Sequence, residues 1–173
     1  VTAEWVSEQL PERPSDAHKG TFGTALVVAG SMEFSGALAL AGEAAYRSGA
    51  GLVTLGAAAP LHSALAGSLP EATWLLLPHE KGVIAAVAAD TVRENLERVT
   101  ALLLGPGFGM ADTAGEFLKR LYGDTVAKKS GSLGFVKMPE TESRKKNHIL
   151  HPLIIAADGL KLLAKLPDWA ARL

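Results

Sequence analysis

The sequence has no cysteine among its 173 residues, which excludes disulfides and thiolate metal sites and suits a reducing compartment. We therefore expect a cytoplasmic protein. Basic and acidic residues nearly balance, with a formal net charge of -1 at pH 7, so no charge excess favours nucleic acid or an anionic membrane. No apolar run approaches the roughly 20 residues that a membrane-spanning helix needs. We expect neither nucleic acid nor membrane as a partner.

Hydrophobic residues make up 48 % of the chain, and its length is that of one domain, residues 1–173. Apolar runs bounded by turn residues predict five strands, at residues 22–30, 51–57, 72–78, 99–105 and 152–156. Helical patterns follow them, at residues 36–48, 60–66, 83–98, 111–122 and 159–166. Strands that alternate with helices predict an α/β fold with a mostly parallel central sheet and helices on both faces.

Two segments fall outside this alternation. Residues 1–20 contain two prolines and predict a short lead-in helix followed by an extended arm. Residues 123–151 form a long loop insertion with six lysines and arginines against three acidic residues. We favour a solvated insertion over an arm that binds phosphate or a partner. On that interpretation residues 128–148 are mobile and peripheral, and their deletion leaves stability nearly unchanged.

The chemical signal lies in two glycine-rich stretches, each joining a predicted strand to a predicted helix. We call residues 30–37, GSMEFSGA, the first glycine loop and residues 105–109, GPGFG, the second glycine loop. Glycine leaves backbone N–H groups uncovered, and a following helix N-terminus favours an anion. Neither loop is a Walker A loop or a complete dinucleotide fingerprint. Together they favour an anionic or nucleotide-bearing ligand over plain turns.

The remaining candidates for chemistry are less distinctive. The five histidines are scattered, and the His148-x-x-His151 pair has no third ligand at a matching spacing, so we expect no metal site. No catalytic triad order or nucleophile elbow occurs. Asp158 follows the last predicted strand, where it either caps a helix or faces a ligand at the carboxyl end of the sheet.

Six segments occur in an order and spacing typical of one family. They are HKGTFG (18–23), VVAGS (27–31), SGA (35–37), RSGAGLVTL (47–55), LLGPGFG (103–109) and IIAADGLKLL (154–163). With them the chain resembles the ADP- or ATP-dependent NAD(P)H-hydrate dehydratases from about Arg13 onward, apart from residues 123–151. The resemblance implies a ribokinase-like, three-layer fold.

The resemblance also implies a metabolite-repair reaction. The nucleotide, ADP or ATP with Mg²⁺, phosphorylates the hydroxyl on a hydrated nicotinamide ring, and loss of phosphate restores NADH or NADPH. The matching substrate-binding positions are Ser35, Gly36, Ala37, Gly105, Gly107 and Gly109, with Ala37 and Gly107 the foremost. Further candidates are His18, Lys19 and Asp158. We also expect a homo-oligomer.

The chain departs from the family pattern in two respects. Ala156 and Lys161 replace an aspartate and an asparagine beside Asp158. The family's Pro-His-x-Gly-Glu and Gly-x-Gly-Asp motifs do not occur in this sequence, so the expected catalytic aspartate lies beyond Leu173. We therefore expect a domain and sheet that are incomplete at the C-terminus, a C-terminal remainder of the same polypeptide as a partner, and no dehydration by these 173 residues alone. The alternatives are another ribokinase-like small-molecule kinase and a non-catalytic nucleotide-binding module.

Overall fold

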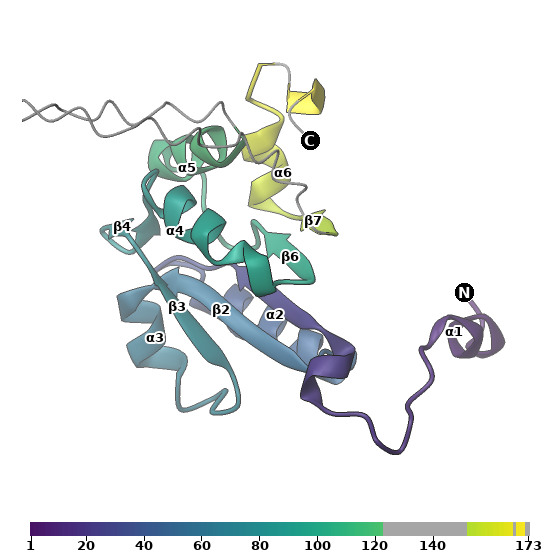
Figure 1. The fold of residues 1–173 in the computed structure, drawn as a ribbon. Helices are drawn as coiled ribbons and strands as arrows, with labels where there is room; N and C mark the ends of the chain where they lie inside the picture. Colours follow the sequence, from purple (N-terminus) through teal and green to yellow (C-terminus); the bar gives the residue numbers. More distant parts are fainter. Residues whose placement is uncertain (123–151, 168, 172–173) are drawn as a thin grey trace, which may run out of the picture.

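A parallel five-stranded sheet forms the centre of the computed structural model, which describes residues 1–122, 152–167 and 169–171 (Figure 1). Its strand order is β3-β2-β1-β6-β7, and every neighbouring pair is parallel. The strands are β1 (Thr24–Val28), β2 (Leu52–Ala58), β3 (Thr73–Leu77), β6 (Ala101–Leu104) and β7 (Leu153–Ile155). All five predicted strands are therefore confirmed, each within about two residues at either end.

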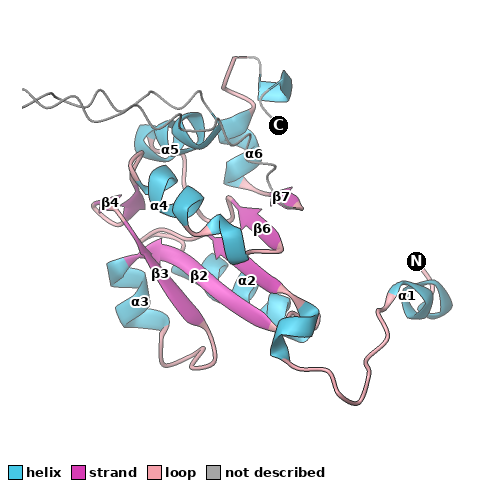
Figure 2. Ribbon diagram, viewed as in Figure 1, coloured by secondary structure: helices cyan, strands magenta, loops and turns pink. Residues whose placement is uncertain are grey.

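Helices cover both faces of this sheet (Figure 2). On one face, Val27 of β1 and Leu55 of β2 belong to a core cluster shared with α2 and α3. On the other face, Leu26 of β1 and Leu104 of β6 belong to a cluster shared with α4, α5 and α6. The helices are α2 (Ser35–Arg47), α3 (Ala59–Leu65), α4 (Ala88–Glu94), α5 (Asp112–Tyr122) and α6 (Asp158–Leu163). Successive strand residues thus pack into cores on opposite faces of the sheet, and the predicted three-layer α/β fold is confirmed.

The single helix predicted at residues 83–98 is wrong in its first part. Two short strands, β4 (His79–Glu80) and β5 (Val83–Ile84), instead form a small antiparallel hairpin. Lys81 and Gly82 make its two-residue turn, both with positive φ, which suits the right-handed twist of paired strands. The helix begins only at Ala88, and a 3₁₀ turn, η2 (Leu96–Arg98), follows it.

The small residues of α2 allow it to lie close to the sheet, and a glycine makes one such close approach. A Cβ on Gly42 would lie 2.8 Å from Leu55 Cδ2, so no larger residue fits there without movement of the sheet side chain. Leu38 is buried beside it, whereas Ala44 is exposed. The alanines flank this contact.

The predicted lead-in helix and arm are also present. All residues of α1 (Ala3–Gln9) are exposed, and the helix lies apart from the rest of the chain (Figure 1). The arm is attached at Arg13, whose guanidinium lies 4.3 Å from the ring centroid of Phe22 in η1 (Lys19–Phe22). The predictions for residues 123–151 lie outside the described residues. Within the described part, no helix is both long and apolar enough to cross a membrane. A last 3₁₀ turn, η3, spans Trp169–Ala171.

Candidate functional site

The two glycine loops meet at the point where the strand order reverses. From β1 the chain crosses to β2 on one side, whereas β6 lies on the other side of β1 and leads on to β7. Ligands of open α/β sheets bind at such a switch point, beyond the carboxyl ends of the strands. Both loops leave the sheet there. A hydrogen bond from Gly30 N–H to the Pro106 carbonyl (2.8 Å) joins them, and Gly105 N–H of the second loop donates to the carbonyl of Val28 in β1 (3.2 Å).

Ala37 and Gly107 are in contact across the two loops. Gly107 has a φ of 68°, and a Cβ on it would lie 2.7 Å from Ala37 Cβ and 2.9 Å from the Phe34 carbonyl oxygen. A larger residue at either position would push the loops apart. Their small size thus has a packing cause that does not depend on a ligand.

Gly36 has no such packing cause. It occupies the first turn of α2, its φ is not in the left-handed region, and a Cβ on it would meet no atom of the described residues within 4 Å. Glycine inside a helix costs about 1 kcal/mol relative to alanine. Gly109 differs in having a φ of 74°, which itself favours glycine, but a Cβ there would have only the Phe34 ring nearby, at 3.9 Å. Space above the backbone is therefore available at Gly36 and Gly109.

The start of α2 suits a negatively charged ligand. The N-cap residue Phe34 makes no side-chain cap hydrogen bond, so it leaves the first helical N–H groups, at Ser35 and Gly36, uncapped by its side chain. These groups carry the positive end of the helix dipole. Phosphate groups bind at such positions.

Asp158 reaches this site from α6 and completes it on the β7 side. Its Oδ2 accepts a hydrogen bond from Gly109 N–H at 3.1 Å, and its Oδ1 lies 3.1 Å from Lys161 Nζ. Ala157, with a φ of 50°, is the N-cap of α6, so Asp158 is the first helical residue rather than the cap. Gly105 permits this approach, because a Cβ on it would lie 2.6 Å from Gly159 Cα. Asp158 therefore orders the second glycine loop, and its charge is paired.

His18 and Lys19 are not brought to the site. Both precede β1, at the amino end of the sheet, whereas the glycine loops lie at the carboxyl end. The five residues of β1 separate the two ends by roughly 16 Å. His18 instead caps η1, with Nδ1 accepting a hydrogen bond from Gly20 N–H at 3.1 Å.

Sequence reasoning missed the large apolar side chains around the loops. Met32, Phe34 and Met110 are exposed by 57 %, 47 % and 41 %, respectively. Met32 and Phe34 belong to the first glycine loop, and Met110 follows the second. The signal that could have found them is the placement of large apolar residues in loops otherwise built from small ones.

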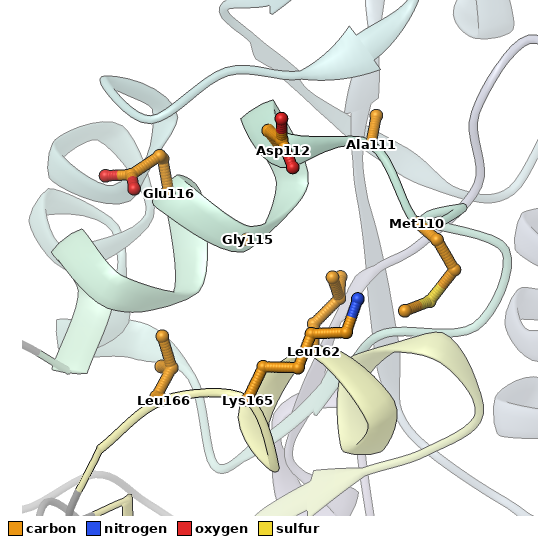
Figure 3. A pocket seen from close by; sticks show the side chains of 8 residues that line it. All are labelled: Met110, Ala111, Asp112, Gly115, Glu116, Leu162, Lys165 and Leu166. Atoms are coloured by element: carbon orange, nitrogen blue, oxygen red, sulfur yellow. The ribbon is translucent and has the colours of Figure 1, made fainter.

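A hollow of about 310 Å³ lies between α5 and α6 and adjoins the second glycine loop (Figure 3). Lys165, which follows α6, extends into it, with Asp112 and Glu116 on the α5 side. Its other lining residues are Met110, Ala111, Gly115, Leu162 and Leu166. Within residues 1–122 and 152–171, as far as they are described, no three acidic or histidine side chains gather so that they could hold a metal ion. We therefore assign no metal ligand among the described residues.

Comparison with known proteins gives one consistent result. A family model described as NAD(P)H-hydrate dehydratase matches residues 25–172. The bifunctional NAD(P)H-hydrate repair enzyme of Salinibacter ruber is 35 % identical over 156 residues, 89 % of this chain and 24 % of that protein. The ADP-dependent (S)-NAD(P)H-hydrate dehydratase of Bacillus subtilis is 39 % identical over 112 residues, 65 % of this chain and 38 % of that protein.

Solved structures agree with the sequence relatives. A Bacillus subtilis ADP/ATP-dependent NAD(P)H-hydrate dehydratase, co-crystallised with ATP/Mg²⁺, superposes with a TM-score of 0.56 at 36 % identity, covering 70 % of this chain and 41 % of that one. A ribokinase-like superfamily protein of Enterococcus faecalis gives a TM-score of 0.59 at 28 % identity, covering 70 % and 40 %. The chain thus spans about a quarter to two fifths of the length of these relatives, and the ribokinase-like fold is confirmed for the matched part.

Proposed function

This chain belongs to the NAD(P)H-hydrate dehydratase family, and on that premise we propose that its two glycine loops hold the substrate of an enzyme that returns hydrated NADH or NADPH to NAD(P)H with ADP or ATP as phosphoryl donor. The observation that carries the proposal is the meeting of the loops at the switch point of the sheet, with open backbone at Gly36 and Gly109. The relatives are named hydrate dehydratases or repair enzymes, which favours this reaction over phosphorylation of another small molecule.

The proposed reaction has two balanced steps. The hydroxyl oxygen of the hydrated ring attacks the terminal phosphorus of ADP or ATP, losing its proton, while the bond from that phosphorus to the leaving AMP or ADP breaks. The ring then loses a proton as its C–O bond breaks, which releases inorganic phosphate and restores the double bond. Catalysis of phosphoryl transfer depends chiefly on positioning and on stabilising charge.

The chain's own part in this reaction is to bind and orient. The start of α2 offers N–H groups to a pyrophosphate, and Gly36 and Gly109 let the dinucleotide approach the backbone. Asp158 fixes the Gly109 N–H by a direct hydrogen bond. We therefore assign substrate binding to Ser35, Gly36, Ala37, Gly105, Gly107 and Gly109, and loop positioning to Asp158.

The compartment and the oligomeric state of the protein are also part of the proposal. We propose the cytoplasm as the compartment, because hydrated NAD(P)H and the nucleotide donor are metabolites found there. Self-association also stays a prediction, and light scattering on the purified protein tests it through the molar mass.

Binding of the hydrate to the 173-residue chain tests the proposal directly. Isothermal titration with hydrated NADH is expected to give saturable binding, and Gly36→Val is expected to abolish it. The variant with Gly67→Val is the matched control, since a Cβ at Gly67, as at Gly36, meets nothing within 4 Å and neither glycine has a left-handed φ. Binding that persists in Gly36→Val, or fails in wild type, would overturn the proposed site.

One observation favours a second candidate for this chain, a nucleotide-binding module without catalysis. Lys161 pairs with Asp158, so the acid nearest the loops is engaged rather than poised as a base. Recovery of NADH absorbance from hydrated NADH, with ADP or ATP and Mg²⁺, separates the two candidates when the C-terminal part of the domain is supplied in cis or as a separate chain. Turnover then supports the dehydratase, and saturable binding that still lacks turnover supports the module.

A further inference from the structure

Phe34 stands at the crossing of the two glycine loops, in a backbone position that is fixed from both sides. Its N–H donates to the Ser31 carbonyl at 3.0 Å, and its carbonyl accepts from Ala37 N–H at 3.2 Å. The same carbonyl lies 2.9 Å from where a Gly107 Cβ would be. Ser31 is itself buried. The backbone of Phe34 is therefore held before any ligand arrives.

The side chain of Phe34 runs across the second glycine loop. Its Cβ lies 3.0 Å from the position of a Cβ on Gly107, and its Cε2 lies 3.9 Å from that on Gly109. The side chain thus covers the loop from Gly107 to Gly109 while 47 % of the residue's surface remains accessible to solvent. A side chain larger than hydrogen at Gly109 would approach this ring.

A single exposed apolar residue needs no explanation, because much of any protein surface is apolar. Phe34 differs from such a residue in two ways. It stands with exposed Met32 and Met110 in or next to the same two loops, and its position is set by hydrogen bonds and by contact with glycine backbone. Leu40, exposed by 70 % on α2, shows the ordinary case of one apolar side chain on an outer helix face.

We infer that Phe34 is a ligand-contact residue whose ring stacks on a flat ring of the bound dinucleotide; this inference rests on the proposed function. The N–H groups at the start of α2 suit the pyrophosphate, and an aromatic face beside them suits the ring at either end of it. Adenine offers such a flat face throughout, and the nicotinamide ring offers one once phosphate loss has restored its double bond. By stacking, the Phe34 side chain would fix the position of the ligand's ring. It would thereby also fix the direction in which the dinucleotide lies along the loops.

Titration calorimetry of the 173-residue chain tests the stacking, with NADH, AMP and reduced nicotinamide mononucleotide as separate ligands. Stacking of a base on an aromatic side chain gives an expected loss of about tenfold in affinity for Phe34→Ala. Phe34→Tyr is expected to bind as wild type, because it keeps the ring face. Phe34→Leu keeps apolar area without that face and is expected to bind nearly as weakly as Phe34→Ala. Leu40→Ala is the control on the same helix and should leave every affinity unchanged.

The three ligands identify which ring stacks. A loss confined to AMP and NADH assigns adenine, and a loss confined to the mononucleotide and NADH assigns nicotinamide; both support the inference. Equal NADH affinity for wild type, Phe34→Ala and Phe34→Leu overturns the stacking while leaving the proposed site intact. If Phe34→Leu binds with wild-type affinity while Phe34→Ala binds more weakly, stacking is also overturned, because an apolar contact then accounts for the affinity. Absence of NADH, AMP and mononucleotide binding by the wild type overturns the inference, and absence of hydrated NADH binding as well overturns the proposed site.

Discussion

Individual glycines in the two loops serve different purposes, and the difference decides what a substitution does. Gly107 has a left-handed φ and the opposite loop against it, whereas Gly36 has an ordinary helical conformation and open space. A glycine in a helix lowers stability relative to alanine, and at Gly36 neither the backbone conformation nor the packing requires a glycine. Gly36 is thus the residue at which stability and ligand binding are expected to oppose each other.

Replacing Gly36 with alanine should stabilise the fold and weaken binding. The gain in the free energy of unfolding is expected to be about 0.5–1 kcal/mol, because alanine has the higher helix propensity. The added methyl group would stand in the space proposed for the dinucleotide, so its affinity should fall. Urea unfolding measures the first effect and calorimetric titration with NADH the second. Gly67→Ala serves as control, and equal affinity for Gly36→Ala and wild type would contradict a ligand at this position.

Replacing Gly107 with valine should weaken both the fold and binding. A β-branched residue at a φ of 68° is strained, and its Cβ would lie 2.7 Å from Ala37 Cβ. We expect the free energy of unfolding to fall by about 2 kcal/mol, a typical cost of strain and overpacking. Denaturant unfolding and NADH titration on the same preparation check this. A folded variant with unchanged affinity would show that the contact between Ala37 and Gly107 does not shape the site.

At the scale of elements, the β4–β5 hairpin supports the first glycine loop. Met32 N–H donates to the Gly82 carbonyl at 3.2 Å, and the Met32 side chain lies over Gly82, where a Cβ would clash with Met32 Cγ. Gly82 also has a φ of 80°. A hairpin of two short strands thereby holds a loop that follows a different strand, β1.

Replacing Gly82 with alanine should therefore act on the site from a distance. The methyl group would displace Met32 and strain the turn, so we expect a loss of about 1–2 kcal/mol in the free energy of unfolding. Affinity for NADH should fall as well, because the first glycine loop loses its support. Unfolding and titration distinguish the two effects. If stability falls while affinity equals that of the Gly67→Ala control, the hairpin does not position the loop.

The elements also show which parts of the fold the sequence could predict. Apolar runs and glycines locate all five strands and both loops, since these signals are local. The hairpin at His79–Ile84 was missed because Val83 fits the apolar spacing of the helix that follows, and a strand pair of two residues leaves almost no periodic signal. Gly82 was the available clue, because a glycine is common in a two-residue hairpin turn with positive φ, such as the one that Lys81 and Gly82 form.

The meeting of the two loops is a long-range feature that local sequence signals leave open. It depends on β6 pairing with β1 rather than with β3, its predecessor in the main sheet, and pairing partners are set by packing over long separations. The contact of Gly107 with Ala37 has the same origin. From the sequence, both positions were assigned to substrate binding. Only the strand order reveals that their small size also allows the two loops to pack against each other.

At the scale of the whole molecule, the chemistry available in the described residues predicts binding without dehydration. Phosphoryl transfer to the ring hydroxyl needs a base within hydrogen-bond reach of that hydroxyl. The acids nearest the carboxyl edge of the sheet are Glu33, Asp112 and Asp158. Asp158 is paired with Lys161 and bonded to Gly109, Glu33 is exposed in the first glycine loop, and Asp112 begins α5 beside the hollow.

Asp158 is the acid among these three whose carboxylate bonds to a glycine loop, and it is already paired with Lys161. The 173-residue chain, confirmed by mass, should therefore bind hydrated NADH but regenerate no NADH with ADP or ATP and Mg²⁺, as read from the absorbance of the reduced ring. The Bacillus subtilis ADP-dependent dehydratase is the positive control for the assay. Asp158→Asn keeps an acceptor for Gly109 and removes the charge, so wild-type turnover that is lost in this variant would identify Asp158 as the base and contradict its assignment to loop positioning. Turnover that survives in Asp158→Asn would instead place the base on another residue of the chain.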